Sequence, residues 1–267
     1  MYENLPKRIV CLTEETTETL YSIGAEELIV GITQFVKRPK RARKEKPVVS
    51  RYIDAKIDKI LELEPDLIIA WSDLQADICA ELIKAGQNVM CFNHRTIAGI
   101  LIFIEQLGAL VGRYEDALEF ANSINDKLEI AKAKGLSRKH KPRVYFEEWD
   151  EPIITGISWV SEIIELCGGT DVYSDLSFKF HAKDRILDSP DRVLERDADI
   201  MLASWCGKKF KKDTVLNRNG WEKLTFVIDD EIYELPSEII LQPGPAALTD
   251  GVDLLMEIFD KWESKQK

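Results

Sequence analysis

The chain of 267 residues has little histidine and lacks the short motifs that mark common catalytic sites. It contains three histidines, and the patterns GxSxG, GxxxxGK[ST], HExxH and GxGxxG do not occur. No run of eighteen apolar residues is present, so we expect no membrane span. The net charge of -11 is opposite to the basic surface that nucleic-acid binding requires. These absences favour a binding protein and predict no catalytic residues, no protein-held metal and no nucleic-acid partner.

The sequence also lacks a disulfide or zinc-binding cysteine pattern and a recognisable signal peptide. The five cysteines are odd in number, widely spaced and never arranged as CxxC, and most lie in apolar runs. This usage is typical of buried thiols in a reducing compartment. The first residues, MYENLPKRIVCL, enter a predicted strand at once, without the charged start and apolar stretch of a signal peptide. We therefore expect a cytoplasmic protein, with a periplasmic or cell-surface location as the alternative if the sequence was trimmed.

Short apolar runs alternate with amphipathic segments in both halves of the chain. The runs that predict strands are residues 7–12, 28–33, 66–71, 88–92, 143–146, 199–204, 225–228 and 231–234. Those that predict helices are residues 16–24, 56–64, 76–85, 97–111, 159–167, 190–196 and 247–262. This alternation predicts βαβ units and a mostly parallel sheet in each half.

A longer helical segment, residues 113–134, separates the two halves. Its apolar residues recur at intervals of three and four, which indicates one apolar stripe on a charged helix. At a rise of 1.5 Å per residue, such a helix is about 33 Å long. Gly135 is predicted to end it, and residues 137–142 to form an exposed hinge.

The two halves resemble each other. DKILELEPDLIIA (58–70) aligns without a gap with DRVLERDADIMLA (191–203), and TETLYSIGA (17–25) aligns with SEIIELCGG (161–169). An internal duplication follows. The predicted fold is therefore α/β, with two similar lobes of mostly parallel sheet joined by one long rigid helix. The predicted domains are an N-terminal lobe (1–112), a linking helix (113–137) and a C-terminal lobe (138–267).

Aromatic residues gather where predicted strands end, which is where open parallel sheets bind ligands. Four of the six tryptophans lie at strand ends or at the start of a helix, a placement that suits a large, flat, partly apolar ligand. The alternative is that they only fill the edges of the lobes. Loop residues and the rigid QPGP segment before the last helix complete the candidate set. The predicted ligand-binding residues are Tyr52, Trp71, Trp149, Trp159, Phe180, His181, Trp205, Gln242 and Pro243.

Charged clusters offer further hypotheses. Glu147 and Glu148, with Asp150 and Glu151, surround Trp149 and either grip a cation or amine or serve solubility alone. Seven basic residues within residues 37–46 form either an anion or partner patch or a solvated loop.

Nucleophiles and metal ligands are few. Cys206 has two lysines nearby that could lower its pKa, but no paired base is evident in the sequence. His94 and His181 are candidates to coordinate the metal centre of a ligand, and surface positions are the alternative.

Several stretches resemble the cobalamin-binding proteins of vitamin B12 ABC importers, which belong to the class III, helical-backbone substrate-binding proteins. They are RIVCLTEETTETLYSIGAEELIVGIT, KIDKILELEPDLIIAW, RVYFEEWDEPIITGISWVSEIIELCGGTDVY and the PGP before the last helix. The resemblance implies a non-enzymatic protein that holds cobalamin or a related corrinoid in a cleft between two lobes. Tyr52, Trp71 and Trp149 match aromatic positions of that cleft, as do the Phe180 region and the PGP segment.

The resemblance also implies an ABC permease as a possible partner. The loop GKKFKKD after Trp205 is basic where permease docking uses acidic residues, so an intracellular carrier is considered beside an importer component. The alternatives are a siderophore- or haem-type binder of the same fold and a cytoplasmic enzyme that uses Cys206, His181 or Glu147. No cofactor is expected apart from the ligand itself.

Overall fold

Two compact units make up the protein. In the computed structural model, which describes residues 4–266, the first unit runs to Asn125 and includes the short segment Pro243–Pro245. The second comprises Asp126–Gln242 and the chain from Ala246 onward. The segment Pro243–Pro245 thus belongs to a unit from which it is more than a hundred residues distant in sequence.

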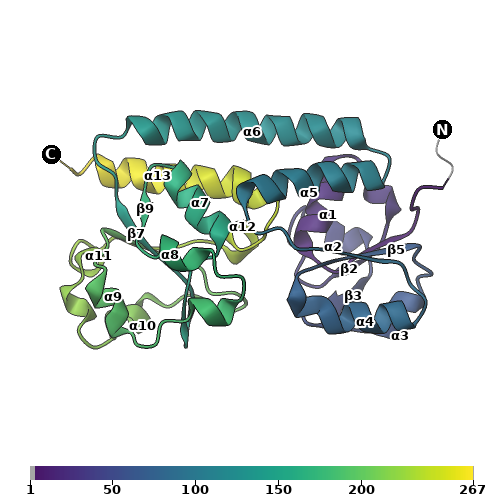
Figure 1. Ribbon diagram of the computed structural model, residues 1–267, viewed down its shortest axis with the longest axis horizontal. Helices are drawn as coiled ribbons and strands as arrows, with labels where there is room; N and C mark the ends of the chain where they lie inside the picture. The colour runs from purple at the N-terminus through teal and green to yellow at the C-terminus, as the bar shows by residue number, and fades with distance from the viewer. Residues whose placement is uncertain (1–3, 267) are drawn as a thin grey trace. The chain divides into compact units, whose positions relative to one another are not determined.

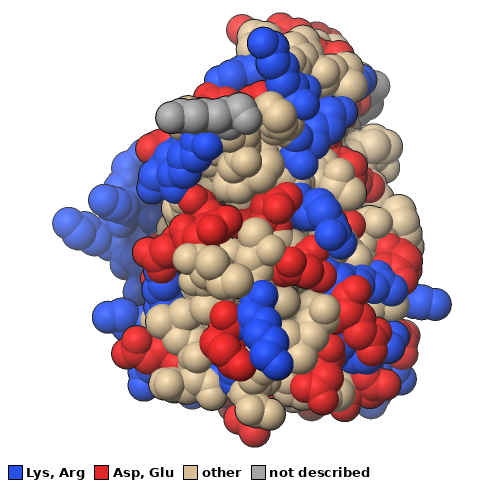
Figure 2. Space-filling model, turned by 90° about the vertical axis from the view of Figure 1, so that its left-hand side faces the viewer, with Lys and Arg blue, Asp and Glu red and all other residues tan. Residues whose placement is uncertain are grey.

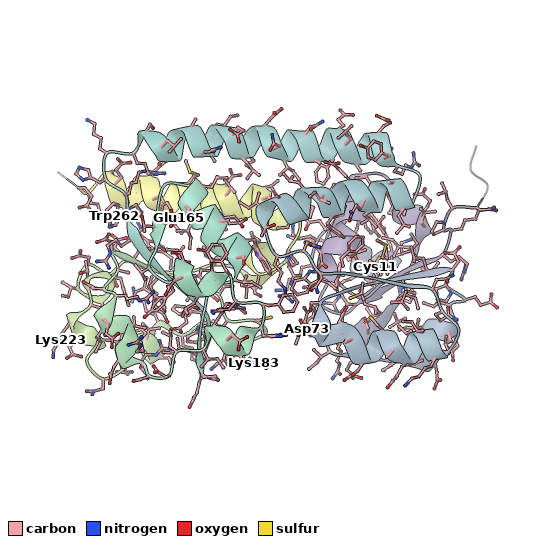
Figure 3. The ribbon with its side chains drawn as sticks, viewed as in Figure 1. Cys11, Asp73, Glu165, Lys183, Lys223 and Trp262 are labelled. Atoms are coloured by element: carbon pink, nitrogen blue, oxygen red, sulfur yellow. The ribbon has the colours of Figure 1, made fainter. Side chains whose placement is uncertain are left out.

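The first unit is built on a six-stranded sheet in the order β4-β3-β2-β1-β5-β6 (Figure 1). The strands are β1 (Ile9–Cys11), β2 (Ile29–Thr33), β3 (Val48–Arg51), β4 (Asp54–Ala55), β5 (Leu67–Trp71) and β6 (Val89–Phe92). All pairs are parallel except β3 with β4, which form a hairpin that the sequence did not predict. The central strands β1 and β5 are buried throughout, which explains their uninterrupted apolar runs, and Cys11 lies among the buried side chains (Figure 3).

Helices cover both faces of this sheet. They are α1 (Glu14–Ser22), α2 (Ala42–Glu45), α3 (Ile57–Leu61), α4 (Ala76–Lys84) and α5 (Ile97–Leu110). Figure 1 shows α1 and α5 on one face, and α3 and α4 on the other. The parallel strands, which are all but β4, therefore have their carboxyl ends at the same edge of the sheet, where the loops into the helices begin.

The second unit repeats this plan around the order β11-β10-β7-β8, with β9 also paired to β7. The strands are β7 (Arg143–Asp150), β8 (Ile153–Thr155), β9 (Thr170–Asp171), β10 (Ile200–Ala203) and β11 (Ile232–Glu234). Only the β7–β8 pair is antiparallel. Strands β8 and β9 are too short to have been recognised from the sequence.

The helices of the second unit are mostly short. They are α7 (Ser158–Leu166), α8 (Ser174–Ser177), α9 (Asp191–Glu195), α10 (Lys212–Leu216), α11 (Thr225–Ile228), α12 (Ser237–Ile240) and α13 (Val252–Glu263), the last preceded by a π-helical turn, Ala247–Gly251. The predicted strand at 225–228 is wrong, because this segment is α11. Asp197 accepts hydrogen bonds from the backbone N–H and hydroxyl of Thr225 and so holds the first turn of that helix.

Strand registers make the two units comparable residue by residue. β1 pairs Ile9 with Leu67, and β7 pairs Val144 with Ile200. The duplicated sequence aligns Leu67 with Ile200, so Leu12, three residues after Ile9, and Glu147, three residues after Val144, occupy equivalent positions. Both are fully buried. One unit therefore places an apolar side chain where the other places a carboxylate.

The long helix α6 (Tyr114–Ser137) begins in the first unit and ends in the second. The prediction that Gly135 ends it is wrong, because Gly135 lies inside the helix. A Cβ on Gly135 would lie 2.6 Å from the Leu166 carbonyl oxygen and 2.7 Å from the Gly168 nitrogen. Glycine is required at this position because the backbone at the end of α7 packs directly against α6.

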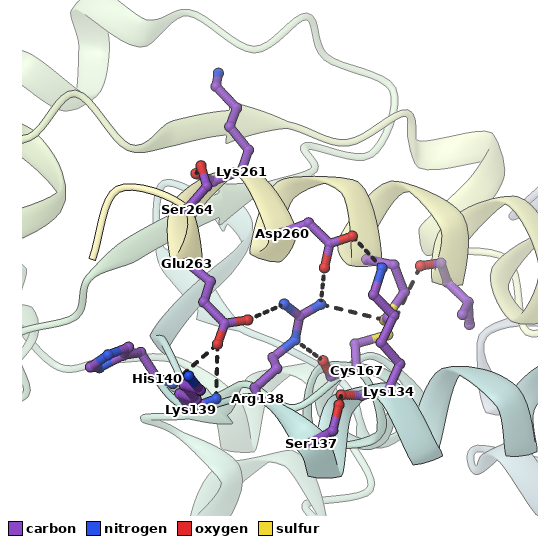
Figure 4. A network of polar contacts seen from close by, with 12 residues as sticks. Lys134, Ser137, Arg138, Lys139, His140, Cys167, Asp260, Lys261, Glu263 and Ser264 are labelled. Carbon is purple, nitrogen blue, oxygen red and sulfur yellow. Dashed lines mark hydrogen bonds and ion pairs between the residues drawn. The ribbon is translucent and has the colours of Figure 1, made fainter. Parts of the chain in front are cut away.

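The predicted exposed hinge at 137–142 is wrong at Arg138, whose side chain is 2% exposed. Its guanidinium group donates to the Cys167 carbonyl oxygen (2.9 Å) and forms ion pairs with Asp260 (2.8 Å) and Glu263 (3.0 Å) on α13 (Figure 4). Glu263 also accepts from two backbone N–H groups just after α6. The end of α6 is thus fixed to α13 by buried charge.

The surface mixes charges of both signs, and acidic and basic side chains are interspersed on the face in Figure 2. Among residues 4–266, no helix combines the length and apolar character needed to cross a bilayer.

Candidate functional site

One buried side chain organises the loops at the carboxyl edge of the first unit. Gln75 is fully buried, accepts a hydrogen bond from the Trp71 backbone N–H (3.0 Å) and donates to the carbonyl oxygens of Leu12 (3.1 Å) and Tyr52 (2.7 Å). These three partners follow or end β1, β3 and β5. Sequence reasoning missed Gln75, because its partners Leu12 and Tyr52 are distant along the chain.

Trp71 lies beneath this edge and is 5% exposed. Its indole N–H donates to the His94 carbonyl oxygen (3.1 Å), and the Arg95 guanidinium lies 4.9 Å from its ring centroid. Arg95 in turn pairs with Asp73. Asp73 lies in the loop after β5 and is labelled in Figure 3. The adjacent Ser72 has φ +67°, a sparsely populated conformation for a residue other than glycine and one often found at functional sites. Trp71 therefore acts as a support beneath Arg95 and the loop.

His94 joins the segment Pro243–Pro245 to the first unit. Its Nε2 lies 2.7 Å from the Pro243 carbonyl oxygen, and its ring stacks on Phe103 at 4.5 Å. Burial lowers the pKa of His94 to about 4, so the ring is neutral at pH 7. The nitrogen bonded to Pro243 must then carry the proton. Pro243 itself is buried, and its role in ligand binding stays a prediction.

Exposed apolar side chains follow three strands of the first unit. Phe35 comes just after β2, Ile53 just after β3 and Leu74 just after β5, and they are 39%, 70% and 57% exposed. Tyr52, beside Ile53, is half-buried. Apolar groups exposed together at the carboxyl edge are typical of a ligand-binding surface. The prediction from sequence did not include Phe35, Ile53 or Leu74, although their distance from the strand ends could have identified them.

A hollow of about 210 Å³ also opens on the first unit, along β3 and the hairpin. Its lining is mostly polar and consists of Gln34, Val48, Val49, Ser50, Arg51, Asp54 and Lys56. Sites that enclose drug-sized ligands usually measure roughly 300–1,000 Å³. This hollow is therefore too small to enclose a tetrapyrrole.

In the second unit, Glu147 lies at the corresponding edge and is fully buried. Its carboxylate forms two hydrogen bonds with Arg218 (2.6 and 2.9 Å) and accepts from the Tyr145 hydroxyl (2.7 Å) and the Trp205 indole N–H (3.0 Å). Burial and the Glu147 carboxylate raise the pKa of Tyr145, which stays protonated. Each of the two Glu147 carboxylate oxygens thus accepts two hydrogen bonds from within the protein. Trp205, one of the donors, is 3% exposed.

Glu148 and Asp150 of the predicted acidic cluster are also paired. Glu148 binds Arg185 through two hydrogen bonds (2.6 and 3.2 Å), and Asp150 binds the ammonium group of Lys208. The Lys208 ammonium also lies 5.5 Å from the Trp149 ring centroid and 5.0 Å from that of Trp205. The cations that these carboxylates bind are therefore side chains of the same protein, Arg185 and Lys208. The Lys208 ammonium group is fixed in position at this edge of the sheet by Asp150 and the two indole rings.

The remaining predicted ligand residues differ in accessibility. Trp159 is 2% exposed and donates to the Ile240 carbonyl oxygen (2.9 Å), whereas Phe180 is 40% exposed with its ring edge-on to His181 at 4.8 Å. His181 and Gln242 are half-buried. Phe178, 74% exposed in the same loop as Phe180, was not predicted. The ligand roles of all of these stay predictions.

The structure also locates the basic segment (residues 37–46) and the five cysteines. In the basic segment, Arg38 pairs with Glu18 (2.8 Å) and Arg41 with Glu26 (2.8 Å), so part of its charge is neutralised within the first unit. Cys11, Cys79 and Cys167 are buried, whereas Cys91 and Cys206 are exposed, and none is in a disulfide.

The sequence matches a family model described as periplasmic binding protein over residues 9–239. Among curated relatives, the vitamin B12-binding protein of Vibrio parahaemolyticus is 25% identical over 264 residues, which cover 98% of this chain and 91% of the relative. An uncharacterized ABC transporter substrate-binding lipoprotein of Bacillus subtilis is 25% identical over 263 residues, covering 94% and 79%.

Solved structures confirm the α/β fold class with two lobes. The periplasmic vitamin B12 binding protein of Vibrio cholerae superposes with a TM-score of 0.77 at 25% identity, covering 98% of this chain and 99% of that one. A periplasmic heme-binding protein from a Roseiflexus species superposes with a TM-score of 0.82 at 20% identity, covering 96% and 99%. At that identity the second likeness concerns the fold alone.

The expectation of a cytoplasmic location is wrong. The matching family model describes periplasmic binding proteins, and similar proteins are a periplasmic protein and a lipoprotein. The first residues of the chain, on which that expectation was based, carry too little information to outweigh these likenesses.

Proposed function

This chain belongs to the periplasmic binding protein family, and on that premise we propose that it is the substrate-binding component of an ABC importer whose ligand is a corrinoid. The observation that carries the proposal is the set of apolar side chains exposed at the carboxyl edge of the first unit: Phe35, Ile53 and Leu74. A soluble protein exposes such groups together mainly where they are covered by something.

The chemistry of these loops suits a large ligand with an apolar body and a polar rim. Ile53 and Leu74 offer apolar contact, and Arg95, held over Trp71 and paired with Asp73, offers charge beside it. In the second unit, Phe180 and the Lys208 ammonium give the same combination. A corrinoid has a flat macrocycle, peripheral amides and a phosphate, and apolar and charged groups of these kinds suit that chemistry. The names of the relatives at 25% identity point to the same ligand.

An importer component passes its ligand to a membrane permease, so the proposal includes such a partner. An enzymatic role would need Cys206, His181 or Glu147 as a reactive group. Glu147 is fully buried and already holds Arg218, so its carboxylate is engaged. A turnover assay that is unchanged by Cys206→Ser and His181→Ala would remove the other two candidates.

The test is a calorimetric titration of the protein with cyanocobalamin, hydroxocobalamin, haemin and a ferric siderophore. We expect saturable binding of both cobalamins and weaker binding of the other two. Preferential binding of haemin or of the siderophore would overturn the choice of ligand while leaving the family role in place. No detectable binding of any of the four compounds would overturn both the choice of ligand and the proposed role as a substrate-binding component.

Ile53→Ser provides the matched variant. Ile53 is 70% exposed, so its replacement leaves the fold intact, but it removes apolar contact with the ligand. We expect cobalamin to bind several-fold more weakly. Ile83→Ser is the control, because Ile83 is 58% exposed near the end of α4, away from the carboxyl ends of the strands. Equal effects of the two substitutions would contradict the placement of the site.

A further inference from the structure

Two cysteines of the first unit lie together in a part of the fold that the proposed function does not use. Cys79 is on α4 and Cys91 is on β6, and the helix packs against that strand. Val89, two residues before Cys91 and on the same face of β6, packs against the apolar cluster that contains Cys79, so Cys91 lies on the face of the strand that α4 covers. Cys79 is 8% exposed and belongs to the apolar core beneath the sheet, whereas Cys91 is exposed to solvent. One thiol is thus accessible and the other lies directly behind it.

We propose that Cys79 and Cys91 are a modification site, a dithiol that oxidises to an intramolecular disulfide by exchange with a small disulfide such as oxidised glutathione. Disulfide formation requires the sulfur atoms to approach to about 2.05 Å, and the packing of α4 on this face of β6 places the two thiols near each other. The loop that closes is short, running from α4 to β6.

The arrangement also sets the order of events. The hydrogen bond from Cys79 lowers the pKa of Cys91 to about 7, and the same contact raises the pKa of Cys79. The Cys91 thiolate therefore attacks one sulfur of the oxidant, and the first glutathione leaves as a thiolate. Cys79 then loses its proton and attacks the Cys91 sulfur, which releases the second glutathione. In total, one protein disulfide and two thiols form from two protein thiols and one disulfide.

The disulfide would also change the edge described above. The Cys91 thiol donates to the carbonyl oxygen of Ser72 (3.6 Å), the residue with positive φ that follows Trp71. Oxidation removes this donor and joins α4 covalently to β6, just before the loop that carries His94 and Arg95. The site is therefore next to the loops that we propose as ligand contacts, but it does not depend on the identity of the ligand.

The test is to incubate the purified full chain with oxidised glutathione, block remaining thiols with an alkylating agent under denaturing conditions, and map the peptides without reduction. We expect a Cys79–Cys91 linked peptide, and a glutathione adduct on Cys206, which is exposed and serves as the internal control. Cys79→Ser should convert Cys91 from a linked residue into a stable glutathione adduct like Cys206.

Two results would overturn the proposal. The first is a glutathione adduct that persists on Cys91 in the unaltered protein while Cys79 is still alkylated. The second is an identical modification pattern for the unaltered protein and Cys79→Ser. Because the readout is covalent and needs no ligand, it is unaffected if the corrinoid proposal fails.

Discussion

Leu12 and Glu147 are equivalent positions of two units with the same strand plan, yet one is an alkyl side chain and the other a buried carboxylate. The first unit holds its strand ends together with neutral groups, chiefly the Gln75 amide. The second unit uses ion pairs, in which Glu147 binds Arg218 and Glu148 binds Arg185. The same topology therefore accepts two electrostatic solutions at the same edge.

The difference extends to the other buried titratable groups. In the first unit, burial raises the pKa of Glu15 to about 8 and lowers the pKa of His94 to about 4, so both are mainly neutral at pH 7. In the second, Arg138 is buried with Asp260 and Glu263 as ionised partners. Between about pH 4 and pH 8, titration of Glu15 and His94 should therefore change the stability of the first unit, and removal of a charged partner should act mainly on the second.

The largest effect should come from breaking the central ion pair of the second unit. Arg218→Met leaves the fully buried Glu147 carboxylate without its counter-ion, which we expect to destabilise the second unit by about 3–5 kcal/mol. Hydrogen exchange measured by mass spectrometry after urea titration would assign the loss to β7 and β10.

The matched double variant, Glu147→Leu with Arg218→Met, gives the second unit the residue that the first has at this position. It should be more stable than Arg218→Met alone, because no unpaired charge remains. If the double variant were less stable, the buried carboxylate would have a structural role beyond its pairing with Arg218.

The next effect is the pH dependence of the first unit through Glu15. Its carboxyl group has a raised pKa when folded, so the stability it contributes is full below pH 4.5 and is lost as the pH rises toward about 8. Over that range the loss should reach a few kcal/mol. Urea unfolding at several pH values, followed by exchange in α1, measures it. Glu15→Gln should abolish this slope, and an unchanged slope would assign it to another group.

His94 should produce a smaller dependence of opposite sign. Its pKa is lowered from 6.5 to about 4, so the stability it contributes is present above pH 6.5 and is lost as the pH falls toward 4. His94→Gln retains a donor for the Pro243 carbonyl oxygen and cannot ionise. Acid unfolding of the variant should begin at a lower pH, as monitored by exchange in α5 and at residues 243–245. An onset at the same pH as in the unaltered protein would contradict this assignment.

Surface charge pairs should matter least. Arg41 is 53% exposed and pairs with Glu26 and Glu45, so we expect Arg41→Ala to change the stability of the first unit by less than about 1 kcal/mol. The comparison with Arg218→Met at low and high salt separates screened from buried pairs. A salt-independent loss above that value would show that the basic segment is structurally more important than its exposure indicates.

Local patterns allowed much of this fold to be predicted. Continuous apolar runs identified β5 and β10, and the duplicated sequence predicted that the two halves share a plan. The same patterns failed where distant parts of the chain decide the structure. Gly135 lies inside α6 because it packs on the backbone of α7, and residues 225–228 are helical partly because Asp197 caps them.

The sequence allowed the location of the candidate site to be predicted, but not the contacts that its residues make. Strand ends located its loops, and Trp71 and Trp149 lie at these ends. Their hydrogen-bond partners were not predictable, because Arg218 is 71 residues from Glu147 and Gln75 is 63 residues from Leu12. Burial of Trp159 and Trp205 likewise depends on packing that no local pattern encodes.

The tryptophan that lies beneath Arg95 has an optical consequence. Trp71 is the one tryptophan of the first unit; the other five are in the second. An indole sealed from water and close to a fixed guanidinium should emit at its own wavelength, distinct from that of the partly exposed Trp149. The difference between the spectra of the unaltered protein and of Trp71→Phe would therefore isolate a signal from a single known position in the first unit.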